Sequence, residues 1–222
     1  MWWQKQRTYS EVTLEDVQVL VNKGRWMLAH RIVRNPNFEL QHTHTAHFWF
    51  LRMLLELLRG HAYGAIHALK RAKQCSDYTP EMAGDTLRDQ ALYAIRKHQL
   101  RIAARLIEQA RPLHKGENRE AVLKMTEARL AQAHDELNKA LKFYEEANEL
   151  WVELGKQGEE YDIQWAKNNR FHWFRCCALA GEPTKDKAKI IITTDPSRPR
   201  RWRVRLICTF GLLGARIDNQ LF

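Results

Sequence analysis

Three histidines lie close together in the segment His42-Thr-His44-Thr-Ala-His47. Neutral imidazole nitrogens at such short spacing can share a zinc ion or another borderline metal ion. No cysteine or acidic residue lies beside the cluster to complete a tetrahedral ligand set. The alternative is structural, with Thr45 capping a helix that begins there. We favour this alternative because metal-ligand geometry is demanding, and we expect no metal and no other cofactor.

Arg25 and His30 form a second candidate site because they could act in acid–base catalysis. Their separation resembles the Arg-xxxx-His motif of HEPN-type ribonucleases, whose polar residue after the arginine is replaced here by Trp26. The resemblance implies a histidine that moves protons and an arginine that stabilises charge on an RNA phosphate. The sequence has no Gly-rich phosphate loop, nucleophile elbow or HExxH motif. A ribonuclease is therefore our third hypothesis, and we expect a protein that is not an enzyme.

Basic residues are concentrated near the C-terminus. The chain has 36 Lys and Arg against 26 Asp and Glu, a formal charge of +10, which favours acidic partners. Guanidinium groups can bind phosphates and an indole can stack on a base. The candidate nucleic-acid-binding residues are Arg198, Arg200, Arg201, Trp202, Arg203 and Arg205. The alternative is a solvated charged face with Trp202 in the core.

The composition favours an all-α protein. The 222 residues are 45% apolar and include only 10 Gly and 6 Pro, which suits helices joined by short connections. The four cysteines form no CxxC pair, and the N-terminus lacks an apolar signal core, so we expect a cytoplasmic protein. Apolar runs are far shorter than the ~20 residues that span a bilayer, so we expect no membrane association.

Small apolar residues recur at fixed intervals in the middle of the chain. Three trios show the same offsets of twelve and then seven positions: Met53, Ala65, Ala72; Ala91, Ala103, Ala110; and Ala128, Ala140, Ala147. Small side chains at a helix crossing let two antiparallel helices pack closely, and alanine does so without a cost in helix propensity. The trios therefore predict three helical hairpins.

This pattern resembles the tetratricopeptide repeat over roughly residues 46–150. The units are spaced 38 and 37 residues apart, and Trp49 matches the early aromatic residue of that family. The resemblance implies a right-handed α-solenoid of antiparallel hairpins. We expect a repeat domain over residues 1–183, opened by a degenerate hairpin that ends at Pro36, and a basic segment over 184–222 packed on the solenoid or extending it.

Two structures fit residues 188–210. Ala188–Thr194 is rich in β-branched residues, and Trp202, Val204 and Leu206 alternate with arginines as they would in a strand. Trp202, Leu206, Phe210 and Leu213 also follow helical spacing. We favour helices here, with a short β-hairpin as the alternative.

A solenoid of this kind presents a concave groove lined by the first helix of each hairpin. The groove residues that the register predicts are Phe50, Leu54, Arg88, Leu92, Met125 and Arg129. A groove of mixed apolar and arginine side chains suits an acidic or amphipathic peptide. Our first hypothesis is therefore an adaptor or scaffold that binds a protein partner as a subunit of a larger complex. The alternative is an RNA- or DNA-binding protein that uses the basic C-terminal segment.

Overall fold

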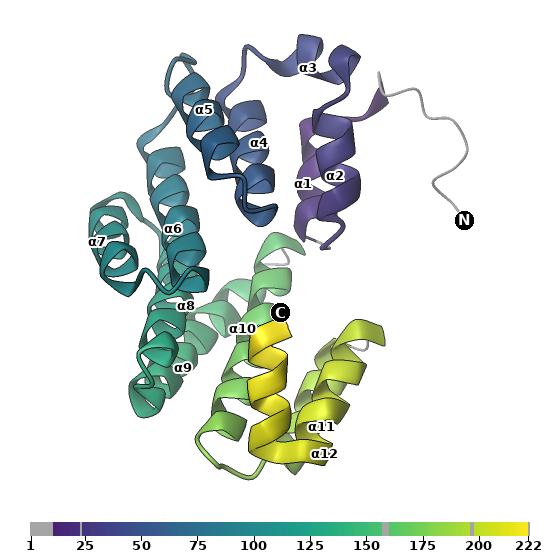
Figure 1. The fold of residues 1–222 in the computed structure, drawn as a ribbon, viewed down its shortest axis with the longest axis vertical. Coiled ribbons are helices and arrows are strands. Elements are labelled where there is room, and N and C mark those ends of the chain that lie inside the picture. Colours follow the sequence, from purple (N-terminus) through teal and green to yellow (C-terminus); the bar gives the residue numbers. More distant parts are fainter. Residues whose placement is uncertain (1–10, 23, 157–159, 196–197, 222) are drawn as a thin grey trace. The chain divides into compact units, whose positions relative to one another are not determined.

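The computed structural model describes residues 11–22, 24–156, 160–195 and 198–221 (Figure 1). Over these ranges it forms helices and no strand, which confirms the all-α class. The helices are α1 (Leu14–Asn22), α2 (Trp26–Val33), α3 (Pro36–His42), α4 (Ala46–Leu58), α5 (Ala62–Ala72), α6 (Pro80–Arg96), α7 (Leu100–Ala110), the short 3-10 helix η2 (Arg111–Leu113), α8 (Glu117–Ala133), α9 (Leu137–Gly155), α10 (Glu160–Leu179), α11 (Lys185–Thr194) and α12 (Arg198–Leu221).

The chain divides into two compact units, residues 1–93 (unit 1) and 94–222 (unit 2), and the boundary falls within α6. These units do not test the predicted boundary at residue 183. The helices α11 and α12 occupy the segment for which a β-hairpin was the alternative, so that alternative is wrong for the described residues. No helix in the described part of the chain is both long and apolar enough to cross a membrane.

Four turns between helices share one backbone geometry. Gly24, Gly60, His98 and Asp135 have φ angles of 71°, 80°, 54° and 62° and lie 36, 38 and 37 residues apart. In each turn the next residue donates its N–H to the carbonyl five residues back, at 2.8 Å in the first and 2.9 Å in the other three. This is the geometry of a left-handed helix cap. The predicted repeat spacing is therefore also present in the backbone.

The alanines at the predicted crossings are buried. Ala65, Ala103 and Ala140 each lie five residues after one of these turns and are at most 3% exposed. Ala29 has the same place after Gly24 and is fully buried, so the α1–α2 hairpin follows the same register. Met53 and the other trio members are also buried: Ala72, Ala91, Ala110, Ala128 and Ala147. Stacking of the hairpins into a solenoid stays a prediction.

Unit 1 is built around one hydrophobic core formed by α1, α2, α3, α4 and α5. Its largest fully buried side chains include Phe38, Phe48 and Met53. Two side chains cap the start of α4: Thr45 accepts the N–H of Phe48 at 3.3 Å, and the carboxylate of Asp77 accepts the N–H of Ala46 at 2.9 and 3.0 Å. These caps satisfy N–H groups that have no partner within the helix.

Unit 2 has one core between α8, α9 and α10 and another between α10, α11 and α12. The helix α12 turns back on itself at Gly211, whose φ of 52° and ψ of −126° are not helical (Figure 1). A Cβ on Gly214 would lie 2.4 Å from the carbonyl oxygen of Leu206, so only glycine permits this close return. The turn brings the end of α12 back against its beginning, which places Asp218 beside Arg203.

Candidate functional site

The two faces of α12 differ in chemistry. Val204 and Ile207 are at most 1% exposed and face the core, whereas Trp202, Phe210 and Leu213 are 52%, 56% and 59% exposed. Trp202 and Phe210 lie before the turn at Gly211 and Leu213 lies after it, so the predicted helical spacing is interrupted at Gly211, and the three exposed side chains are not part of the core. We call Trp202, Phe210 and Leu213 the outer stripe of α12.

The predicted nucleic-acid-binding residues divide between these faces. Arg201 and Arg205 are exposed beside Trp202 of the outer stripe. Arg200 and Arg203 instead turn towards α10, where their guanidinium carbons lie 4.2 and 4.3 Å from the ring centroid of Phe171. The side chain of Arg198 lies outside the described residues.

Asp218 is the centre of the polar contacts on the inner face of α12. Its carboxylate is fully buried and accepts from Nε and Nη2 of Arg203 at 2.6 and 3.0 Å. Nη1 of Arg175, on α10, lies 3.6 Å from the same carboxylate, and no acceptor is found for the buried Nε of Arg175 in the described structure. One carboxylate is therefore shared by two guanidinium groups.

A second ion pair lies beside the first. Nε of Arg200 donates to the carboxylate of Asp195 at 3.0 Å, and its Nη2 donates to the side-chain oxygen of Asn168 at 2.8 Å. Arg200 is therefore fixed by groups at the end of α11 and on α10. Its guanidinium stabilises the local structure and is not turned outwards.

Arg129, on α8, has no such partner. It is half-buried, and no hydrogen bond or ion pair of its guanidinium is found in the described part of the chain. Burial, together with the charges of Arg175 and Arg96, lowers the pKa of Arg129 to about 10, so it remains charged at neutral pH. Burial raises the pKa of the neighbouring Tyr144 phenol to about 12, and the phenol stays neutral. Tyr144 donates its hydroxyl to Gln132 at 3.1 Å.

The imidazole of His172 contacts the ring of Tyr144 and is affected by the charges of the arginines. Its ring stacks on Tyr144 with 6.4 Å between centroids, and its Nδ1 is buried without a hydrogen-bond partner in the described structure. Burial and the positive charges of four arginines lower the pKa of His172 well below its usual range. We call these four residues the arginine cluster: Arg129, Arg175, Arg200 and Arg203.

The predicted groove residues lie in both units. Phe50, Leu54, Arg88 and Leu92 belong to unit 1, and Met125 and Arg129 belong to unit 2, so the structure describes no single surface that contains all six. Phe50 and Leu54 pack against the core of unit 1 and remain partly accessible, while Met125 is 1% exposed in unit 2. Leu92 is half-buried on α6. The groove stays a prediction; of its two arginines, Arg88 is paired, and Arg129 shows no hydrogen bond or ion pair within the part of the chain that the structure describes.

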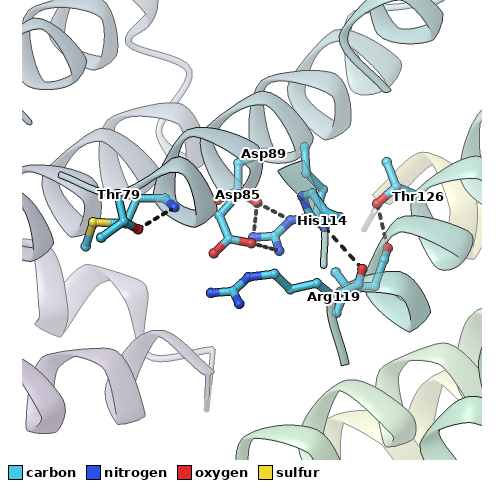
Figure 2. A network of polar contacts seen from close by, with 9 residues as sticks. Thr79, Asp85, Asp89, His114, Arg119 and Thr126 are labelled. Carbon is cyan, nitrogen blue, oxygen red and sulfur yellow. Dashed lines mark hydrogen bonds and ion pairs between the residues drawn. The ribbon is translucent and has the colours of Figure 1, made fainter. Parts of the chain in front are cut away.

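Arg88 is 4% exposed on α6 and is bound by two carboxylates (Figure 2). Its Nη1 donates to Asp85 at 2.8 Å, and its Nε and Nη2 donate to Asp89 at 3.0 and 2.9 Å. Thr79 caps the same helix by accepting the N–H of Met82 at 3.2 Å. In unit 2, Figure 2 shows Nδ1 of His114 facing the carbonyl of Arg119 at 3.2 Å. These three hydrogen bonds of Arg88 lie within α6.

The structure does not join the two residues of the ribonuclease-like pair. Arg25 is exposed at the start of α2, and no contact between it and His30 is found in the described residues. Nε2 of His30 lies 2.7 Å from Nη1 of Arg59 and 3.4 Å from the carboxylate of Glu56. Because arginine can only donate, Nε2 of His30 is the acceptor of the shorter bond. That lone pair is therefore occupied and does not serve as a free base.

The histidine segment takes the structural role that we favoured. His42 ends α3 and packs its ring 4.4 Å from that of Phe38, and Thr45 caps α4. Burial lowers the pKa values of His42 and His47. Nowhere in the described ranges do three histidine, cysteine or acidic side chains come together as a metal site.

No protein-family model, curated protein or solved structure matches this chain.

The sequence did not point to Asp218, Arg175 or His172 as members of one site. The pattern that could have suggested it is Arg203 and Asp218 on opposite sides of Gly211 and Gly214, since two glycines in a helical segment permit a tight return. No local pattern distinguishes Arg175 from a surface arginine.

Proposed function

We propose that this protein is a helical-repeat adaptor that binds a partner protein through an acidic, amphipathic helical segment. In this proposal the hairpins stack as a right-handed tetratricopeptide-like solenoid. The outer stripe of α12 is the observation that carries the proposal. Trp202 and Phe210, before the turn at Gly211, and Leu213, just after it, are each more than half exposed, and large exposed apolar side chains of this kind mark interaction sites.

Charge complementarity indicates what kind of segment would cover the outer stripe. Arg201 and Arg205 are exposed on the same helix, and the chain as a whole carries a formal charge of +10. A partner helix with an apolar face and acidic flanks would bury the stripe and pair with both arginines. The apolar contacts would supply affinity, and the charges would orient the partner and speed association.

The experiment compares three forms of the protein as baits in nuclease-treated extract of the native cell: wild type, Phe210→Ser/Leu213→Ser, and a control. The control is Leu40→Ser/Ile66→Ser, which removes two other exposed apolar side chains, 81% and 52% exposed, from unit 1. We expect one protein to be captured at a fixed ratio by the wild type and the control and lost with the α12 variant. Equal capture by all three baits would contradict the proposal.

The second candidate function is nucleic-acid binding, favoured by the exposure of Arg201, Trp202 and Arg205 on one helix. Filter binding of single-stranded RNA and DNA across a salt series tests it. If both arginines contact phosphates, Arg201→Gln/Arg205→Gln should reduce the slope of log affinity against log salt by about 1 to 2. Absence of retention at low salt would exclude this function.

A further inference from the structure

The exposed face of α5, in unit 1, carries aromatic rings and cations along one line. Tyr63 near its start is 85% exposed, and exposed basic side chains follow at its end. Side chains three or four positions apart are neighbours on a helix surface, so these side chains form a continuous row. We call the following residues the α5 row: Tyr63, Ile66, His67, Lys70 and Lys73.

No carboxylate offsets the positive charge at the end of the row. Residues 60–76 include Lys70, Arg71 and Lys73 but no Asp or Glu. All three cations are exposed, and none forms an ion pair within the described ranges. By contrast, exposed lysines on α9 and α11 pair with carboxylates one turn away. The end of α5 is therefore a surface that favours a polyanion.

Arg71 is oriented by a ring and not by a carboxylate. Its guanidinium carbon lies over Trp49 on α4, 5.3 Å from the ring centroid. The indole is itself fixed, because its Nε1 donates to the carbonyl of Thr43 at 2.8 Å. The ring of His67 contacts the same indole with 6.3 Å between centroids, which places the α5 row beside Arg71. A guanidinium stacked on a ring keeps its N–H donors available for a phosphate.

We propose that the α5 row, together with Arg71, binds a single strand of RNA or DNA. Lys70, Arg71 and Lys73 contact the phosphates, and Tyr63 provides a ring on which an unpaired base stacks. An acidic peptide would pair with the cations but would not need an aromatic ring beside them. This surface belongs to unit 1 and shares no residue with the outer stripe of α12. It therefore goes beyond the proposed function and does not depend on it.

The test is fluorescence anisotropy of labelled oligo(U) and oligo(dT), each about 12 nucleotides long, titrated with the full chain across a salt series. Lys70→Gln/Lys73→Gln should raise the Kd about tenfold at low salt and reduce the slope of log affinity against log salt by about 1 to 2. The matched control is Lys139→Gln/Lys142→Gln, which removes the same charge from exposed side chains of α9. It should leave the Kd and the slope close to those of the wild type.

Two replacements of Tyr63 test the stacking separately from the charge. Tyr63→Phe keeps the ring and should bind the strand normally. Tyr63→Leu keeps an apolar side chain without a ring, so its Kd should rise by about fivefold or more. Because this side chain is 85% exposed, neither replacement should change Tm appreciably.

The proposal fails if the wild type binds neither oligonucleotide at low salt, if the lysine variants of α5 and α9 bind equally, or if Tyr63→Leu binds as tightly as Tyr63→Phe. Polyglutamate that displaces the labelled strand as effectively as unlabelled oligo(U) would show that the surface takes an acidic protein instead. Arg201→Gln/Arg205→Gln separates this surface from α12. Loss of binding in that variant alone would assign the strand to α12 and overturn the role of α5.

Discussion

Unit 1 and unit 2 each bury a carboxylate among nitrogen-bearing side chains, and they differ in the residues that surround it. In unit 1, Glu56 is 4% exposed and lies beside His30 and His61 at 3.4 and 3.2 Å. In unit 2, Asp218 is fully buried beside two arginines. The difference lies in whether the neighbours can change their charge.

A histidine can adjust its protonation to its surroundings, and an arginine cannot. Burial and the charge of Arg59 lower the pKa of His30, so its ring stays neutral at pH 7. No comparable adjustment is open to Arg129, whose charge persists beside Arg175. The buried carboxylate of unit 1 therefore lies beside a side chain whose charge can change, whereas that of unit 2 lies beside side chains whose charge is fixed.

Removing the central carboxylate of unit 2 should have the largest effect. Asp218→Ala leaves the buried guanidiniums of Arg175 and Arg203 without their shared partner, so we expect a loss of about 3 to 5 kcal/mol in the free energy of unfolding. Urea unfolding measures the loss, and amide hydrogen exchange assigns it to unit 2. The control is Asp186→Ala, whose carboxylate is 92% exposed; it should change stability by less than about 0.5 kcal/mol. Similar losses in both variants would contradict the central role of Asp218.

Straightening the turn in α12 should have the next largest effect, because it moves Asp218 away from the arginines. Gly211→Ala places a side chain on a backbone with φ of 52° and ψ of −126°, which should cost about 1 to 3 kcal/mol. The rate of amide hydrogen exchange in the last half of α12 should also rise in this variant. Leu212→Ala changes the exposed neighbour without altering the turn and serves as the control. Equal exchange in the two variants would show that the turn does not hold Asp218.

Replacing Glu56, the buried carboxylate of unit 1, should lower the free energy of unfolding by less than replacing Asp218. Glu56→Gln keeps the shape of the side chain and can still hydrogen-bond to the imidazoles of His30 and His61, so we expect a loss of about 1 to 2 kcal/mol. The loss should appear as faster amide exchange in α2 and α4. The control is Glu39→Gln, whose partly exposed carboxylate pairs with Arg52; it should lose less than about 1 kcal/mol. A loss from Glu56→Gln as large as that from Asp218→Ala would remove the contrast between the units.

The hairpins could be predicted from the sequence because their determinants are local and periodic. Ala65, Ala103 and Ala140 recur at matched offsets, and the structure buries all three after the same turn. The first hairpin was expected in a degenerate form, and Ala29 follows the turn at Gly24 at the same interval, with Pro36 where a trio would have its last alanine.

The polar cluster could not be predicted in the same way. Helical spacing predicted a helix here, but it did not predict which side chains face the core. Trp202 is exposed, which excludes the alternative that placed it in the core, and Arg203 packs inwards on Phe171. Sequence alone gives no reason to bury an arginine beside other arginines. The arrangement depends on the reversal at Gly211, which is a tertiary feature.

The smallest effect is a pH dependence specific to unit 2. Unfolded His172 takes up a proton near pH 6.5, whereas its folded pKa is held lower by burial and by the arginine cluster. The unfolded state then binds more protons, so stability is full above pH 6.5 and falls as the pH is lowered. Between pH 6.5 and 5.5 this proton uptake should lower the free energy of unfolding by about 1 kcal/mol.

His172→Phe keeps a ring beside Tyr144 but does not titrate, so the difference between variant and wild type in urea unfolding isolates this contribution. The shifted histidines of unit 1, including His30, are the same in both proteins and cancel. Parallel pH profiles would show that folding does not lower the pKa of His172, which would contradict the effect ascribed to its burial and to the fixed charges of unit 2.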